Sequence, residues 1–149
     1  MYKRILIPTD GSELSLAAIE QGLAFAKSIG ASVHFFTVSA PIGVYGVGGE
    51  PLVGGYDDYT KAAREEGKRR LAVAAERAQA AGVPCTSAMV ESDHAWEAII
   101  NAANEAGCDL IAMASHGRRG LSGLVLGSET LKVLTHSTIP VLVYRQPKR

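Results

Sequence analysis

The sequence predicts an α/β protein with a single doubly wound parallel sheet that is covered by helices on both faces. Short apolar runs alternate with longer amphipathic stretches along all 149 residues, which is typical of repeated strand–helix units. The short runs are apolar at consecutive positions, as expected for strands that are buried on both sides. The length fits one domain over residues 1–149, and no internal repeat or boundary is visible.

Five runs have the length and the apolar content of buried strands. The first, Ile-Leu-Ile-Pro, begins directly after a polar N-terminus, and the second contains Val33, Phe35, Phe36 and Val38. Short runs of such residues between turn residues indicate strands and not helices. The expected strands are residues 5–8, 32–38, 85–90, 110–113 and 139–144.

Four amphipathic stretches predict the helices between these strands. In the first, Leu16, Ile19 and Leu23 share one helical face, and Gly30 follows as a C-terminal cap. The second is rich in Ala, Glu, Lys and Arg and stops at Gly82. The expected helices are residues 12–29, 59–81, 94–106 and 128–135.

The alternation favours right-handed crossovers and the strand order 3-2-1-4-5. In that order strands one and four flank the point where the winding direction reverses, and ligands bind there at the carboxyl ends of the strands. Thr9, Asp10 and Ser12 follow strand one, and the segment 115–120 follows strand four. The sequence therefore predicts a ligand crevice between these two strand exits.

The segment from Ala114 to Ser128 has the chemistry that a phosphate group needs. Its glycines let backbone amides approach an anion closely, and the adjacent Arg118 and Arg119 add positive charge. It ends at Gly127-Ser128, which opens a predicted helix whose first N–H groups lack partners within the helix. We interpret this segment as half of a nucleotide site.

Residues 39–58 form a long connection that is rich in glycine and proline. A connection of this length without structure of its own is usually functional or disordered. Two interpretations stay open, a lid that folds over the crevice and a mobile surface segment.

The composition argues against several classes of function. Lys and Arg together number 15, as do Asp and Glu, so the basic surplus typical of nucleic-acid binders is missing. No run approaches the roughly 20 apolar residues of a membrane span. The first apolar run is too short for a signal-peptide core, so we expect a cytoplasmic protein. Cys85 and Cys108 lack metal or redox spacing, which favours two reduced thiols over a disulfide or a reactive pair.

At these residues the chain resembles the universal stress protein family over essentially its whole length. The resemblance is carried by Ile-Pro-Thr-Asp-Gly-Ser at 7–12, Ser-His-Gly-Arg-Arg-Gly at 115–120, Leu-Gly-Ser at 126–128 and Ile-Pro-Val-Leu-Val at 139–143. Members that bind ATP share Gly-x-x-Gly, a nine-residue spacer, and then Gly followed by Ser or Thr. Gly117, residues 118–126 and Gly127-Ser128 fit the later part of this pattern, whereas Ala114 replaces the first glycine. Another branch of the family has lost the glycines and binds no nucleotide.

The resemblance implies a Rossmann-like fold of the adenine nucleotide α-hydrolase type and the binding of ATP, with or without Mg²⁺. It also implies that Pro8, Thr9 and Asp10 line the nucleoside pocket and that Val38 contacts the base. No direct metal motif is present, so Asp10 is the residue expected to reach a nucleotide-bound Mg²⁺. The residues expected to bind nucleotide are Pro8, Thr9, Asp10, Val38, Met113, Ala114, His116, Gly117, Arg118, Arg119, Gly120, Gly127, Ser128, Glu129 and Thr130.

Several of these residues also have a purely structural interpretation. Asp10 or Ser12 is suited to cap the first helix, and Ser128 is suited to cap the last one. Adjacent arginines on a loop are often simply solvated, and His116 is either a donor near the phosphates or a structural loop residue. Glu129 interacts favourably with the dipole of the last helix even if its side chain points outward and contacts no ligand.

The last strand is expected to form an apolar sheet edge, which invites pairing with another chain. In the family that the chain resembles, this strand pairs with its mate across a two-fold axis, which implies a homodimer. The residues expected at the interface are Ile139, Pro140, Val141, Leu142 and Val143. The alternative is an edge that the C-terminal tail protects.

These features predict an ATP-binding stress-response protein that acts as a nucleotide-dependent regulatory module, with protein partners of unknown identity. The site has a phosphate cradle without an evident nucleophile, general base or metal cluster, so enzymatic turnover is not its expected main role, while slow ATP hydrolysis stays open. The alternative is a dimeric scaffold of the same family that binds no nucleotide, and Ala114 is its support. An adenylate-forming enzyme is disfavoured, because residues 9–12 are too sparse for the glycine- and serine-rich phosphate loop that it needs.

Overall fold

The computed structural model describes residues 1–41, 55–116 and 126–145. Within them five strands alternate with four helices, which confirms the predicted α/β pattern. The elements are β1 (Arg4–Pro8), α1 (Glu13–Ile29), β2 (Ser32–Ser39), α2 (Tyr56–Ala81), β3 (Cys85–Glu91), α3 (Ala95–Glu105), β4 (Leu110–Ala114), α4 (Ser128–His136) and β5 (Val141–Tyr144). Most of the connection expected at 39–58, residues 42–54, lies outside the described residues, so neither interpretation of it is tested.

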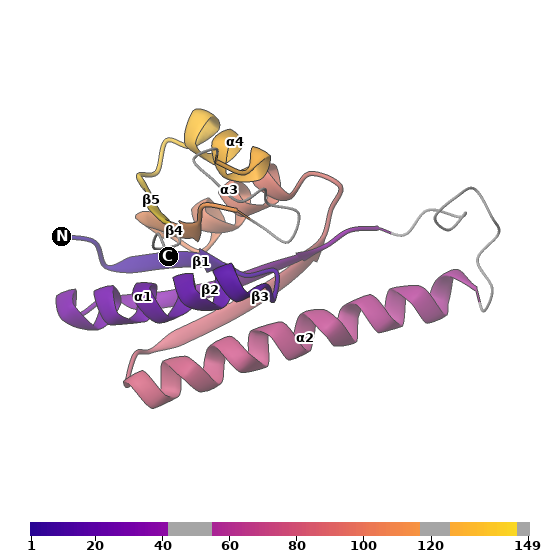
Figure 1. Cartoon of the computed structure of the whole chain (residues 1–149), viewed down its shortest axis with the longest axis horizontal. Helices are drawn as coiled ribbons and strands as arrows, with labels where there is room; N and C mark the ends of the chain where they lie inside the picture. The colour runs from indigo at the N-terminus through magenta and orange to yellow at the C-terminus, as the bar shows by residue number, and fades with distance from the viewer. Residues whose placement is uncertain (42–54, 117–125, 146–149) are drawn as a thin grey trace.

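The strands form one parallel sheet in the order β3-β2-β1-β4-β5, which confirms the predicted order. Ile7 of β1 pairs with Phe35 of β2, and Ile5 pairs with Leu110 of β4. Helices α1 and α2 cover one face of the sheet, and α3 and α4 cover the other (Figure 1). The winding direction therefore reverses between β1 and β4.

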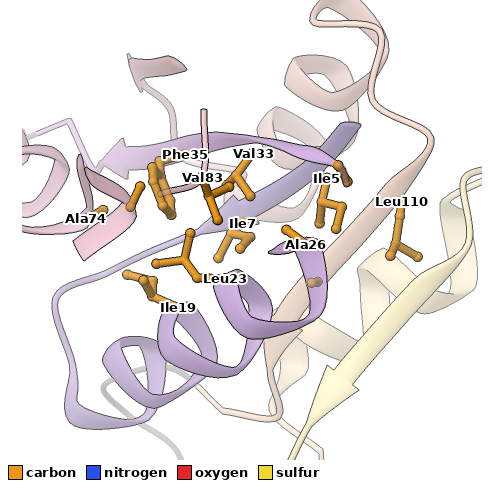
Figure 2. Close-up of a cluster of buried hydrophobic side chains, with 13 residues drawn as sticks. Ile5, Ile7, Ile19, Leu23, Ala26, Val33, Phe35, Ala74, Val83 and Leu110 are labelled. Carbon is orange, nitrogen blue, oxygen red and sulfur yellow. The ribbon is translucent and has the colours of Figure 1, made fainter. Parts of the chain in front are cut away.

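Buried side chains of β1 and β2 pack against α1 and α2 on the first face (Figure 2). Ile5 and Ile7 are fully buried there, together with Leu23 of α1. Gly22 lets α1 approach the sheet closely, because a Cβ at this position would lie 2.6 Å from Ile7 Cδ1. The close packing holds α1 firmly against β1.

The second face has a core of its own, made by the intervening strand residues. Leu6 of β1 and Ile111 and Met113 of β4 point to this side, since successive side chains of a strand alternate between faces. They pack with Ile99 of α3 and Val133 of α4. This core holds α3 and α4 over the boundary between β1 and β4.

Helix α2 begins at Tyr56 and not at Tyr59, so the predicted start is wrong. Asp57 and Asp58 lie in the first turn, where carboxylates interact favourably with the helix dipole. Gly55 precedes the helix at a φ of 87°, a conformation that glycine adopts without strain. Among the helices in the described part of the chain, none is long and apolar enough to cross a membrane.

Strand β5 begins at Val141, so the predicted start at Ile139 is also wrong. Pro140 has no N–H to donate to a ladder, although its carbonyl oxygen accepts a hydrogen bond from Ile111 N at 3.0 Å. Strand β2, inside the sheet, extends to Ser39, one residue beyond its predicted end.

Cys85 and Cys108 are free thiols that lie with different halves of the core. Burial raises the pKa of the Cys108 thiol to about 11. The thiol therefore stays protonated at neutral pH, and Cys108 acts there as a small apolar core residue.

Candidate functional site

A cavity of about 440 Å³ opens where β1 and β4 end, at the position of the predicted crevice. The predicted residues that line it are Pro8, Thr9, Asp10, Val38, Met113, Ala114, His116, Gly127, Ser128, Glu129 and Thr130. Four further residues line it without having been predicted, and these are Ser15, Phe36, Ala95 and Ile99. Gly117, Arg118, Arg119 and Gly120 lie outside the described residues.

Part of the cavity wall is apolar. It is formed by Phe36 and Val38 of β2, Met113 of β4, and Ala95 and Ile99 of α3. Most of these side chains also belong to the core on the second face of the sheet or pack against it. The apolar wall of the cavity is therefore continuous with that core. A wall of this kind favours the burial of a flat apolar group such as an aromatic base.

The exit of β1 is held by a short network of hydrogen bonds. Thr9 N donates to Phe36 O at 2.8 Å, and Ser12 N donates to Asp10 Oδ1 at 2.9 Å. Ser15 N donates to Ser12 Oγ at 3.2 Å, so Ser12 and not Asp10 is the cap of α1. Asp10 is thereby placed with its carboxylate in a tight turn that lines the cavity.

Helix α4 begins at the opposite strand exit, and its N-terminal end lines the cavity. The N-cap residue is Gly127, with φ −61° and ψ 151°, and no side chain caps the helix. The structure therefore excludes Ser128 as the cap, because Ser128 is the first helical residue. Gly127 N donates to Ser115 O at 2.8 Å, which ties the start of the helix to the end of β4. The first amides of α4 and its dipole form a setting that favours an anion.

Thr130 lines the cavity, but its hydroxyl is committed to the backbone. Thr130 Oγ1 donates to Ala114 O at 3.0 Å, and the residue is only 3% exposed. This proton is therefore not available to a phosphate. The hydrogen bond instead fixes the first turn of α4 to the end of β4.

Ala114, which replaces the first motif glycine, sits in ordinary strand conformation. It is the last residue of β4, and within the described residues no residue other than glycine has a positive φ. The alanine therefore causes no backbone strain of the kind that a glycine relieves. Its effect is confined to one methyl group in the cavity wall, where the residue is 8% exposed.

His116 lines the cavity and has one ring nitrogen without a hydrogen-bond partner among the described residues. The residue is 8% exposed, and its Nδ1 lies 3.0 Å from Ser115 Oγ. Its Nε2 is buried without a hydrogen-bond partner among the described residues. A buried polar atom that lacks a partner costs free energy, and a ligand that supplies one recovers that cost.

Glu129 does not simply point outward from α4. Its Oε2 accepts a hydrogen bond from Trp96 N of α3 at 2.8 Å, and its Oε1 lies 3.9 Å from Lys132 Nζ. His94 is the N-cap of α3 and provides no side-chain cap, so Glu129 supplies the missing acceptor from the neighbouring helix. Sequence reasoning missed this contact because it joins two separate helices.

Strand β5 lies at the edge of the described sheet, and Val141–Tyr144 are all half-buried. Ile111 N and Ser115 N of the β4 side donate to Pro140 O and Tyr144 O. Because the pattern repeats every second residue, the backbone groups of Val143 point away from β4. Helix α4 also exposes Leu131 and Leu134, at 54% and 39%.

The strand order, the cavity at the switch point and the helix N-terminus beside it define a doubly wound α/β protein with a candidate ligand site between β1 and β4. The sequence model of the universal stress protein family matches residues 1–145, and the chain belongs to this family. Universal stress protein MJ0531 of Methanocaldococcus jannaschii is 34% identical, and the match covers 100% of this chain and 85% of that protein. YxiE of Bacillus subtilis is 32% identical, with 97% of this chain and 100% of YxiE covered.

Solved structures share the fold. Hypothetical protein MJ0577 of Methanocaldococcus jannaschii superposes with a TM-score of 0.81 at 26% identity, over 100% of this chain and 99% of that chain. A universal stress protein in complex with cAMP superposes with a TM-score of 0.70 at 24% identity, over 96% of this chain and 97% of that chain. A universal stress protein from Archaeoglobus fulgidus in complex with dAMP superposes with a TM-score of 0.63 at 18% identity, over 95% of this chain and 97% of that chain. The sequence identity to these last two structures is so low that the comparison shows a shared fold and nothing more.

Proposed function

We propose that this protein binds ATP in the cavity between β1 and β4 and acts as a nucleotide-dependent module in a cytoplasmic stress response, without being a turnover enzyme. The observation that carries the proposal is the N-terminus of α4, which opens into an apolar cavity with no side-chain cap. An anion is the natural partner of such an end. The volume of about 440 Å³ is in the range of small-molecule sites.

The parts of the cavity suit the parts of a nucleotide. The apolar wall around Val38 and Met113 suits a base, and Asp10 offers carboxylate oxygens to ribose hydroxyls. The amides at Ser128 and the unpaired Nε2 of His116 suit a phosphate. Adenine mononucleotides are the ligands of two neighbours that share the fold, which is consistent with this assignment.

A magnesium ion fits this site as a companion of the phosphates. The described residues contain no group of three or more His, Cys, Asp or Glu side chains that could hold a metal ion by themselves. Two acidic residues, Asp10 and Glu129, nevertheless line the cavity. Mg²⁺ typically takes one or two carboxylates together with phosphate oxygens and water. When bound, the ion would neutralise phosphate charge, and these two residues would hold it.

We also propose that the protein is a homodimer through β5, with residues 139–143 at the interface. An edge strand with outward backbone groups and half-buried apolar side chains is a template for pairing with a second copy. Ile139 and Pro140 would then contact the partner from the turn before the strand and not from the strand itself.

Calorimetric titration with ATP and Mg²⁺ tests the nucleotide site. We expect micromolar binding to the nucleotide-stripped protein, and loss of that binding in an Asp10→Ala, Gly127→Val double variant, because the variant removes the carboxylate and crowds the amides of α4. Ala114→Gly is the matched control and should change the affinity less than about threefold, since Ala114 is unstrained. An absence of binding to the folded wild-type protein would contradict the proposal and favour a scaffold that binds no nucleotide.

A further inference from the structure

Two helix N-termini meet at the cavity, and they differ in what occupies them. Ala95 at the start of α3 and Ser128 at the start of α4 both line the cavity. Neither helix has a side-chain cap from its own N-cap residue. The start of α3 receives the carboxylate of Glu129, which accepts from Trp96 N at 2.8 Å. The start of α4 has no such internal anion among the described residues.

The open end of α4 is marked as a ligand position by a second observation. His116 is more than nine-tenths buried, lines the same cavity and leaves its Nε2 without a partner in the described part of the chain. A ligand anion at α4 therefore meets donors on one side. The same cavity is also lined by Glu129, a negatively charged residue in the first turn of the same helix.

We infer that Glu129 sets the charge that the cavity accepts at the phosphate end of its ligand. The carboxylate already occupies the end of α3, so a phosphate chain that extends from α4 toward α3 approaches a like charge. A nucleoside monophosphate has its few charges at α4 and is affected least. A triphosphate bears more phosphate charge and is disfavoured until a divalent cation neutralises it. This inference rests on the proposed nucleotide site.

The contacts of Glu129 keep its charge in place. The hydrogen bond from Trp96 N holds one oxygen, and Lys132 Nζ lies 3.9 Å from the other. The side chains of Lys132 and Glu129 are 51% and 45% exposed, so solvent screens this ion pair and the lysine compensates the carboxylate only partly. The partial exposure also moderates the repulsion, and an effect of about tenfold in relative affinity is expected at low ionic strength.

The test compares AMP and ATP in chelator-containing, low-salt buffer and then ATP with excess Mg²⁺. Glu129→Gln removes the charge and retains an oxygen that accepts from Trp96 N, so α3 keeps its cap. Glu97→Gln is the matched control, because Glu97 lies in the first turn of α3 and is exposed away from the cavity lining. Both variants have the same net charge.

In the wild type without Mg²⁺, we expect AMP to bind with higher affinity than ATP. Addition of Mg²⁺ should raise the affinity for ATP. In Glu129→Gln the ATP-to-AMP affinity ratio should rise by about tenfold without Mg²⁺, and the effect of Mg²⁺ should shrink. In Glu97→Gln the ratio should stay as in the wild type. An unchanged ratio in Glu129→Gln, or an equal rise in Glu97→Gln, would overturn the inference and leave the nucleotide site intact. If neither nucleotide binds to the folded wild type in any buffer, the proposed function itself fails.

Discussion

The hydrogen bond from Thr130 to Ala114 joins the N-terminal end of α4, the proposed phosphate position, to the sheet, and its removal has a calculable cost. Thr130→Val keeps the shape of the side chain and deletes the hydroxyl, which leaves the carbonyl oxygen of Ala114, a residue that is 8% exposed, without this donor. An unsatisfied buried carbonyl costs about 1–3 kcal/mol, and the added methyl group offsets part of this. We expect the free energy of unfolding to fall by about 1.5 kcal/mol, which corresponds to a decrease in Tm of about 3–6 °C.

Urea unfolding, followed by the fluorescence of the single tryptophan, Trp96, measures this change. Thr135→Val is the matched control, because Thr135 Oγ1 donates to Leu131 O within α4 but the residue is exposed, so a loss below about 0.5 kcal/mol is expected. Thr130→Val should also weaken ATP binding about fivefold, because the amides of α4 lose their alignment. Equal losses of stability in the two variants would refute the reasoning that the Thr130 bond anchors the site.

Three further predictions concern other parts of the molecule. Gly22→Ala should lower the free energy of unfolding, measured in urea titrations, by about 1 kcal/mol, because overpacking against Ile7 outweighs the gain in helix propensity. A variant more stable than the wild type would contradict this prediction. Burial alone would raise the pKa of Asp109, but hydrogen bonds from the amides of Arg4 and Lys3 and the nearby amino terminus hold this pKa below its usual range. The stability that Asp109 provides is full above about pH 4 and is lost as the pH falls through the lower folded pKa, so Asp109→Asn should flatten the acid limb of a stability–pH profile. Val143→Pro should convert the proposed dimer to a folded monomer in sedimentation measurements. The substitution removes an N–H that points outward from the edge of β5 and leaves the hydrogen bonds between β4 and β5 intact. An unchanged dimer would place the interface elsewhere.

The fold was largely predictable because parallel strands covered on both faces are apolar at nearly every position. That pattern is clearest in β1 and β4, and the alternation of strands and helices supported the order 3-2-1-4-5. Edge strand β3, with the sequence CTSAMVE, is more polar and largely exposed, and its start follows the helix-ending Gly82 and Pro84. The errors lie at element ends. Tyr56 begins α2 inside a glycine-rich stretch, and Pro140 lacks the N–H that would extend β5. Both starts depend on local capping and hydrogen bonding that hydrophobic periodicity does not record.

The site was predictable where chain topology brings strand exits together. Asp10 and Gly127 lie far apart in sequence and line one cavity, because β1 and β4 are neighbours at the switch point. The contribution of Ala95 was missed, since α3 follows the edge strand β3 and reaches the cavity only through its packing on the second face. The partners of Glu129 and Thr130 were missed for a similar reason. Their hydrogen bonds join different elements, and sequence spacing carries no trace of them.

The central claim, that the N-terminus of α4 holds the phosphate end of a nucleotide, is tested most directly by backbone amide NMR during a titration with ATP and Mg²⁺. The account predicts the largest shifts at the amides of Ser128, Glu129 and Thr130, with a second group at Thr9 and Asp10 across the cavity. Saturable binding whose shifts gather away from these two strand exits, or no shifts in the folded protein, would contradict it.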